Sequence, residues 1–367
     1  MNQGLGTVFF YIVPFVLSFG LSFVLTPIIR KLAFKWQVVD VQNEPRKTHP
    51  TGMIPELGGW AVVISFLVIG GIAWVFGWLT DVRINHLQII GIFVGALLLA
   101  LHGFIDDKYN LKALHLFMIP TFVSFIVVWF GVRVGYVTNL FESGIGPFGL
   151  SLFYFTPLVG VIFSFLWILG MMYTVKFLDG LDGLVAGVGF IGAVILFVVS
   201  LFWDVPLSGT SILALILAGS LLGFLPYNWH PAKIFLGESS MFVGFMLGVL
   251  SIISGAKIAT ALLIMGIPIL DVVWVIFRRI FYERHSPFLA DRKHLHFRLL
   301  DMGLSHKKTV MLLYFLTAFF GSISIFLQSK QKVVALVSLG MVMIGLVTLV
   351  LVRYHRQEVI GNDKDIV

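Results

Sequence analysis

The stretch Lys176-Phe-Leu-Asp179-Gly-Leu-Asp182-Gly-Leu184 places two carboxylates between two long apolar runs. Residues 150–175 before it and 185–203 after it carry no charge, and each run is long enough to cross a bilayer as a helix. An aspartate at the centre of a membrane helix costs about 2.5–3.5 kcal/mol, so such residues usually persist for a function. If the helix continued through both aspartates, their spacing of three would put them on one face. They could instead merely end a helix at the water boundary, but a pair flanked by glycines favours a functional site.

The composition predicts an all-α polytopic membrane protein that forms a single integral-membrane domain over residues 1–367. Hydrophobic residues make up 59% of the chain and charged residues only 12%, and the mean hydropathy is +1.00. The absence of cysteine excludes disulfides, thiolate zinc sites and cysteine nucleophiles. Apolar runs between charged gaps predict about eleven transmembrane helices, near residues 8–29, 57–79, 87–105, 113–132, 151–175, 184–203, 208–225, 239–256, 259–277, 308–328 and 333–352.

The distribution of charge predicts the orientation. With the N-terminus outside, twenty of the twenty-five Lys and Arg residues fall on the inside, which is the positive-inside pattern, and the C-terminus is then cytoplasmic. Fifteen of the eighteen acids fall on that same side, which the positive-inside rule does not require. We therefore expect a site for a phosphorylated, metal-bound substrate at the cytoplasmic face. The net charge of +7 does not imply a nucleic-acid partner, because membrane proteins collect basic residues on one side.

The third predicted span ends in a group suited to a divalent cation. Asp106 and Asp107 are adjacent, and Asn110 and Lys112 follow closely. Mg²⁺ prefers oxygen ligands and usually binds one or two carboxylates together with substrate phosphates. Lysines beside such a site can hold phosphate. A solvated charged turn is the alternative, and it suits the lysine better than the two acids.

The first inside loop and the start of the second span are weaker candidates for phosphate binding. Arg46, Lys47 and His49 could meet phosphate, although lipid-headgroup contact explains a basic loop equally well. Gly58 and Gly59 open the second span, and a helix start with accessible backbone N–H groups attracts anions. The outside gap over residues 134–149 could form a small hairpin.

Three later inside segments add polar groups. Asn228 could read a base edge or position a loop, and Glu238 adds a carboxylate. Asp271 lies in an apolar run, where a structural ion pair with a nearby Arg or Lys is as plausible as a catalytic role. The last segment packs basic residues that suit a diphosphate better than a zinc site: Arg292, His294, His296 and Arg298.

These stretches, in this order, resemble the polyprenyl-phosphate N-acetylhexosamine-1-phosphate transferases, the glycosyltransferase 4 or MraY-like family. The resemblance covers the whole chain and is closest to the WecA/TagO branch. It rests on five blocks: Asp106-Asp107, residues 177–184, Asn228 with Pro231-Ala232 and residues 234–237, residues 268–271, and residues 290–296.

The resemblance implies a phosphotransferase that moves N-acetylglucosamine-1-phosphate from UDP-GlcNAc to undecaprenyl phosphate and releases UMP. This would be the first membrane step of a cell-envelope glycan pathway, such as lipopolysaccharide or teichoic acid biosynthesis, in a multi-pass protein of the plasma (inner) membrane. It implies Mg²⁺ or Mn²⁺ as cofactor and leaves a homodimer open. The implied catalytic residues are Asp106, Asp107, Asp179 and Asp182; the substrate-binding residues are Lys47, Asn110, Lys112, Asn228, Arg292, His294, His296 and Arg298; the metal ligands are Asp106, Asp107 and Glu238.

Three positions depart from the family pattern. Lys176 stands where the family usually has Asn, Glu238 where it has Asp, and Phe297 where it has His. A charged lysine cannot ligate Mg²⁺ and could instead pair with Glu238. Lys176 and Glu238 therefore leave open a divergent relative of low activity that binds lipid phosphate. The alternative enzyme is an MraY-like phospho-MurNAc-pentapeptide transferase. A transporter is disfavoured, because its charges would lie near the bilayer midplane and its sequence would often show repeats.

Overall fold

The computed structural model describes residues 2–40, 53–143, 150–203, 207–255, 257–284 and 293–364, and the structural statements below concern these residues. In chain order the elements are α1 (Asn2–Lys35), β1 (Val39–Asp40), β2 (Ile54–Pro55), α2 (Gly58–Val75), α3 (His86–Tyr109), α4 (Ala113–Trp129), β3 (Tyr136–Ser143), β4 (Leu150–Tyr154), α5 (Pro157–Leu178), α6 (Leu184–Trp203), α7 (Gly209–Asn228), η1 (Glu238–Ser240), α8 (Met241–Ile253), α9 (Ile258–Arg278), the π-helical turn η2 (Arg279–Glu283), α10 (Leu295–Asp301), α11 (His306–Phe326) and α12 (Ser329–Lys364).

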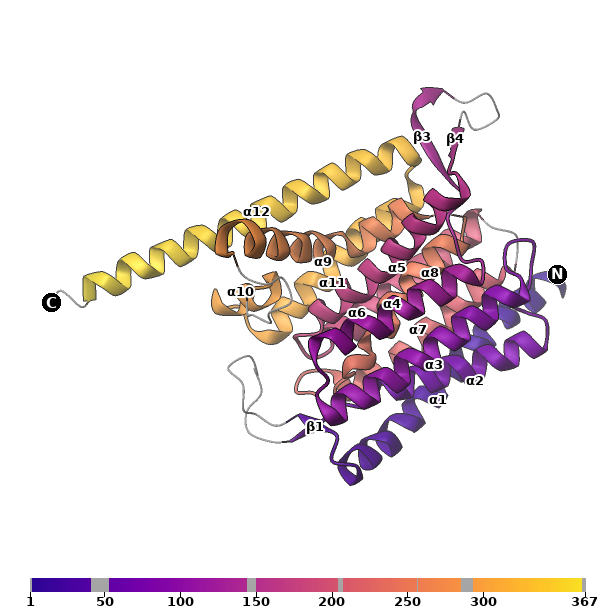
Figure 1. The fold of residues 1–367 in the computed structure, drawn as a ribbon, viewed down its shortest axis with the longest axis horizontal. Helices are drawn as coiled ribbons and strands as arrows, with labels where there is room; N and C mark the ends of the chain where they lie inside the picture. The colour runs from indigo at the N-terminus through magenta and orange to yellow at the C-terminus, as the bar shows by residue number, and fades with distance from the viewer. Residues whose placement is uncertain are drawn as a thin grey trace.

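The long helices run side by side in one bundle (Figure 1). Nine helices in the described ranges are long and apolar enough to cross a membrane. Two shorter apolar helices, α4 and α8, lie where the sequence predicts the two remaining spans. The predicted all-α polytopic membrane fold is confirmed, whereas the count of eleven spans and their orientation stay predictions.

Helix α7 forms the centre of the bundle. Its membrane-length window is 83% buried, whereas the corresponding windows of α1 and α12 are 17% buried, so these two lie at the rim. α1 packs against α7 through glycines: a Cβ atom on Gly219 would lie 2.4 Å from the Phe15 carbonyl oxygen, and one on Gly223 would lie 2.3 Å from the Phe19 carbonyl oxygen. Small residues four apart commonly let two membrane helices approach this closely.

The structure corrects the start of the fifth predicted span. The expected hairpin does form, with Tyr136 of β3 opposite Tyr154 of β4, but β4 includes residues 151–154 of the predicted span. Helix α5 begins at Pro157, preceded by Thr156, whose Oγ1 accepts the Val159 N–H. A threonine cap followed by proline is a strong helix start, so the helix begins six residues later than predicted.

The start of α2 holds the segment before η1 in place. The N–H groups of Gly58 and Gly59 donate to the carbonyl oxygens of Phe235 and Leu236 at 2.8 and 2.9 Å. Side chains here would collide with the same oxygens, because a Cβ atom would lie 2.5 Å from the first and 2.8 Å from the second. The expectation that these N–H groups bind an anion is therefore wrong, since the protein itself uses them.

The close contact between α1 and α7 predicts that one added methyl group between them lowers the stability of the protein. Gly223→Ala should force the helices apart and lower stability by about 1–3 kcal/mol, because overpacking a tight contact costs this much. Gly20→Ala is the matched control on α1, since no atom lies within 4 Å of its added Cβ. The check is the melting temperature of the purified protein in detergent, and equal melting temperatures for both variants would contradict the packing described.

Candidate active site

The end of α3 carries two aspartates that are held differently. The Asp106 Oδ1 atom accepts the Leu111 N–H at 2.8 Å. The Asp107 Oδ1 atom accepts the Glu238 N–H at 2.9 Å and so joins α3 to η1. The Asp107 Oδ2 atom is buried with no hydrogen-bond partner among the described residues, and a Cβ atom on Gly237 would lie 2.3 Å from it. Asp107 is therefore enclosed by the loop that it anchors.

Lys176, in the last turn of α5, forms an ion pair with Glu238. The side chains are only 23% and 12% exposed, so both charges are largely removed from water. The pairing that the sequence predicts between these residues is confirmed. Removing one partner of such a pair would leave an uncompensated charge, which costs far more than the pair contributes.

The turn after α5 separates the two aspartates that the sequence placed together. The helix ends at Leu178, so Asp179 and Asp182 do not share a helix face. Asp179 is exposed, yet the protein packed around its carboxyl group raises the pKa of Asp179; a hydrogen bond from the Ser240 side chain lowers it, and the carboxylates of Glu238 and Asp182 raise it. The carboxyl group therefore gives up its proton less readily than an ordinary aspartate.

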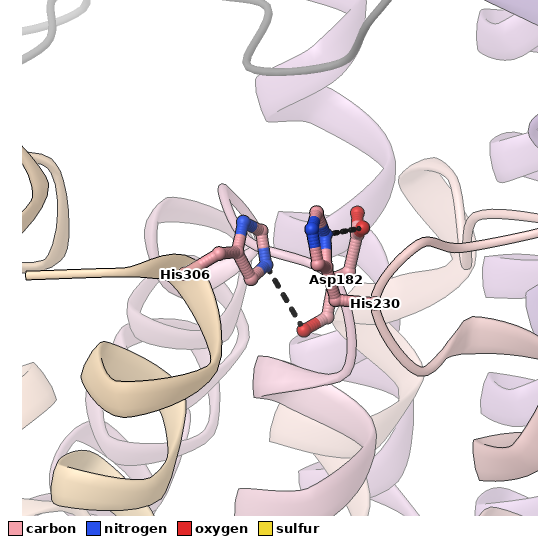
Figure 2. Close-up of side chains that lie close together, drawn as sticks. All are labelled: Asp182, His230 and His306. Carbon is pink, nitrogen blue, oxygen red and sulfur yellow. Dashed lines mark hydrogen bonds and ion pairs between the residues drawn. The ribbon is translucent and has the colours of Figure 1, made fainter.

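Asp182 is 3% exposed and lies beside two histidines (Figure 2). Its Oδ2 atom is 2.7 Å from His230 Nδ1 and accepts the Ala232 N–H at 3.1 Å. The rings of His230 and His306 stack with their centroids 4.0 Å apart, and His306 Nε2 is 3.4 Å from the Asp182 carbonyl oxygen. With the carboxylate ionised and the imidazole neutral, His230 carries its proton on Nδ1, and its Nε2 atom is then a hydrogen-bond acceptor.

Asn228, at the end of α7, positions a loop. Its Oδ1 atom accepts the Gly183 N–H at 3.0 Å, and its Nδ2 atom donates to the Ile234 carbonyl oxygen at 3.0 Å. The side chain is buried and ties the turn after α5 to the segment before η1. The sequence left two roles open for Asn228, reading a base edge or positioning a loop. These contacts show that it positions a loop.

The two predicted histidines lie where α10 begins. Asp271 of α9 accepts the Leu295 N–H through Oδ1 at 2.9 Å, and its Oδ2 atom is 2.8 Å from His294 Nδ1. Its partner is thus a histidine rather than the Arg or Lys considered from the sequence. His296 is 1% exposed and lies against Gly180, where a Cβ atom would be 2.4 Å from His296 Nε2. Burial lowers the pKa of His296 to about 3, so this ring is neutral at physiological pH.

The remaining predicted residues lie at the margin or outside the described ranges. Asn110 ends α3 in the left-handed conformation (φ 50°), and Lys112 precedes α4; both are exposed. Arg298 is half-buried on α10. Lys47 and Arg292 lie outside the residues that the structure describes.

An apolar cavity of about 500 Å³ borders this polar end. Residues of α4, α5 and α9 line it, among them Phe117, Gly170, Phe177 and Val273. Phe117 and Val273 are exposed on the outside of the bundle, so the cavity is reached from the side that lipid would cover. Phe177 follows Lys176 in the chain, and its ring lies 5.5 Å from that of His294. The cavity therefore extends from the apolar surface to the charged site.

The predicted metal ligands do not fit a divalent cation. One group in the described part of the chain brings three ligand atoms within 4.8 Å of one another, and it consists of Asp182, His230 and His306. Asp106, Asp107 and Glu238 form no such group: the Asp107 carboxylate is enclosed by the loop, and Glu238 is bound to a lysine. The expected Mg²⁺ or Mn²⁺ site at these three acids is not assembled.

Sequence reasoning missed His230 and His306. They lie 48 and 124 positions from Asp182, and neither belongs to a local motif that suggests a common site. The one available signal was the position of His230 two residues after Asn228, in a block that the resemblance already covered.

Comparison with known proteins identifies the family of this chain. The sequence model of the family described as glycosyl transferase family 4 matches residues 89–255. The chain is 34% identical to a probable undecaprenyl-phosphate N-acetylglucosaminyl 1-phosphate transferase of Bacillus subtilis, over 87% of this chain and 85% of that protein. It is 32% identical to a decaprenyl-phosphate N-acetylglucosaminephosphotransferase of Mycobacterium tuberculosis, over 88% and 84%. It is 28% identical to an undecaprenyl-phosphate alpha-N-acetylglucosaminyl 1-phosphate transferase of Escherichia coli, over 83% and 80%. The chain belongs to the polyprenyl-phosphate N-acetylhexosamine-1-phosphate transferases, a family of membrane phosphotransferases.

Proposed function

We propose that the chain transfers N-acetylglucosamine-1-phosphate from UDP-GlcNAc to undecaprenyl phosphate at the cytoplasmic face of the plasma membrane. The products would be undecaprenyl-diphosphate-GlcNAc and UMP, which begin a cell-envelope glycan. The printed names of its relatives support the sugar phosphate and a polyprenyl acceptor, although undecaprenyl and decaprenyl acceptors both occur among them. The observation that carries the proposal is the apolar cavity that meets a charged site at Phe177.

The lipid acceptor would lie with its chain in this cavity. A polyprenyl chain is apolar and flexible, so it can enter between α5 and α9 from the membrane without crossing a polar barrier. Its phosphate would then reach the end of α5, where Lys176 offers an ammonium group. The acceptor is bound in this way by apolar burial along the chain and by charge at its head.

The reaction needs positioning and charge neutralisation more than a dedicated base. A phosphate monoester has a second pKa near 6, so the acceptor is mostly dianionic at neutral pH. Its oxygen would attack the sugar-bearing phosphorus of the donor in line, and the bond from that phosphorus to UMP would break, so UMP leaves with the bridging oxygen. The obstacle is bringing two polyanions together, and cationic and N–H groups at the site would reduce it.

The carboxylates take different parts in this scheme. Asp182 and Asp271 hold His230 and His294 in fixed orientations, and Asp107 holds the turn of η1. Asp179 is the exposed member, and its raised pKa suits it to take up the one proton that a monoanionic acceptor phosphate still carries before that phosphate attacks.

Replacing Asp179 tests the assignment. Asp179→Asn keeps the shape but removes the charge and the acceptor capacity, and we expect UMP release to fall about 100-fold or more. Asp301→Asn, an exposed change on α10 at the same end of the bundle, should keep the rate. UMP release from UDP-GlcNAc by the purified protein with a short polyprenyl phosphate measures both, and near-normal turnover in Asp179→Asn would refute its role.

Filling the cavity tests the acceptor site. Gly170 lines the cavity and no atom lies within 4 Å of an added Cβ, so Gly170→Phe should occupy the space without disturbing the fold. The KM for polyprenyl phosphate should rise by about tenfold or more, since a pocket discriminates by 1–3 kcal/mol for even a small change in shape. The KM for UDP-GlcNAc should stay unchanged.

The control for this variant is Gly340→Phe on α12, where an added Cβ also meets no atom within 4 Å but which does not line the cavity. Equal KM values for the lipid in both variants would place the acceptor elsewhere. Running the wild-type assay with UDP-MurNAc-pentapeptide as a competing donor separates the proposed reaction from the MraY-like alternative.

A further inference from the structure

The Lys176 ammonium group lies among carboxylates. It is bound to Glu238, and it also interacts electrostatically with Asp106 and with His102 on α3. Glu238 in turn donates its backbone N–H to Asp107. One fixed positive charge thus lies within interaction distance of the acids that the sequence assigned to a metal ion.

These acids have few oxygens left to offer a second cation. Glu238 Oε1 is taken by the lysine, and Asp107 Oδ1 by a backbone N–H. Asp107 Oδ2 is enclosed beside Gly237, and Asp106 Oδ1 accepts the Leu111 N–H. A divalent cation needs several oxygens that can move to within about 2.1–2.6 Å of it, and one oxygen of each of the three carboxylates is already held by a group of the protein.

The ammonium also repels a divalent cation directly. Like charges a few ångströms apart repel each other more strongly in a partly buried site than in water, and the repulsion doubles when one of them is a divalent ion. The lysine is covalently tethered at the end of α5, so it cannot be displaced from the neighbourhood as a bound water could. Its pairing with Glu238 removes the carboxylate that would otherwise attract the ion.

We propose that Lys176 is the resident cation of this cluster, so that Asp106, Asp107 and Glu238 bind no divalent ion and the lysine supplies the positive charge there. The ammonium group occupies the space between α5 and η1, held by Glu238. This proposal rests on the proposed function in one respect only, which is the action of the Lys176 charge on substrate phosphate. The ion-binding property itself holds for the protein without any substrate.

The test is the binding of Mn²⁺ to the purified full-length protein in detergent, without substrates, followed by the loss of the free-ion electron paramagnetic resonance signal. Lys176→Asn should gain one bound Mn²⁺ per chain relative to wild type, because it frees Glu238 and removes the repulsion. Lys176→Asn combined with Glu238→Gln should lose the gained ion. Lys176→Arg, which keeps the charge, should behave as wild type.

The matched control is Lys108→Asn, which removes the same charge at an exposed position near the end of α3, over the rings of Phe104 and Tyr109. It should gain no ion. Binding at Asp182, His230 and His306 would be common to all variants and would cancel in the comparison.

A second comparison does not depend on Lys176→Asn folding. Glu238→Gln alone should leave the Mn²⁺ stoichiometry of the wild-type protein unchanged. Loss of a bound ion in Glu238→Gln, or a folded Lys176→Asn that gains none, would overturn the proposal. Both readouts hold even if no UMP is released, so failure of the proposed function and failure of this inference are distinguishable.

Discussion

The ion pair between Lys176 and Glu238 is the contact on which the polar end of the bundle depends. It joins the last turn of α5 to η1, and the Glu238 N–H continues the connection to Asp107 at the end of α3. In a chain that is 59% hydrophobic, charges so far from bulk water persist only when they are matched. The pair therefore fixes three helix ends relative to one another and sets the charge of the site between them.

The other buried acids at this end are also matched by a partner, but the partner is a histidine rather than a lysine. Asp182 is matched by His230, and Asp271 by His294, and each carboxylate also accepts one backbone N–H. Asp182, which the family resemblance assigns to catalysis, and Asp271 thus both orient imidazoles. Each imidazole therefore has one nitrogen fixed by a carboxylate.

Much of the fold could be predicted from the sequence, because apolar length alone identifies a membrane helix. The limits of that signal show at α5, where apolar residues 150–154 form a strand instead, and at Asp179, where the helix stops before the predicted pair is complete. Hydropathy does not distinguish a strand from a helix over five apolar residues, and it contains no information on where a turn begins.

The sequence predicts several residues of the candidate site, but it predicts few of the contacts between them. The pairing of Lys176 with Glu238 followed from their two departures from the family pattern and is confirmed. The loop role of Asn228 and the histidines around Asp182 depend on tertiary contacts between distant segments, which one sequence does not show. Burial likewise decided that His296 is neutral, although the motif suggested a basic clamp.

A site with a tethered cation, beside a cavity that opens toward lipid, accounts for a phosphotransferase that works at the membrane surface. The most direct measurement is the transfer of radiolabelled GlcNAc-1-phosphate from UDP-GlcNAc to a short polyprenyl phosphate by the purified chain. The account predicts that the label moves into the organic phase in proportion to UMP formed. Label that stays in the aqueous phase while the protein is folded would contradict it.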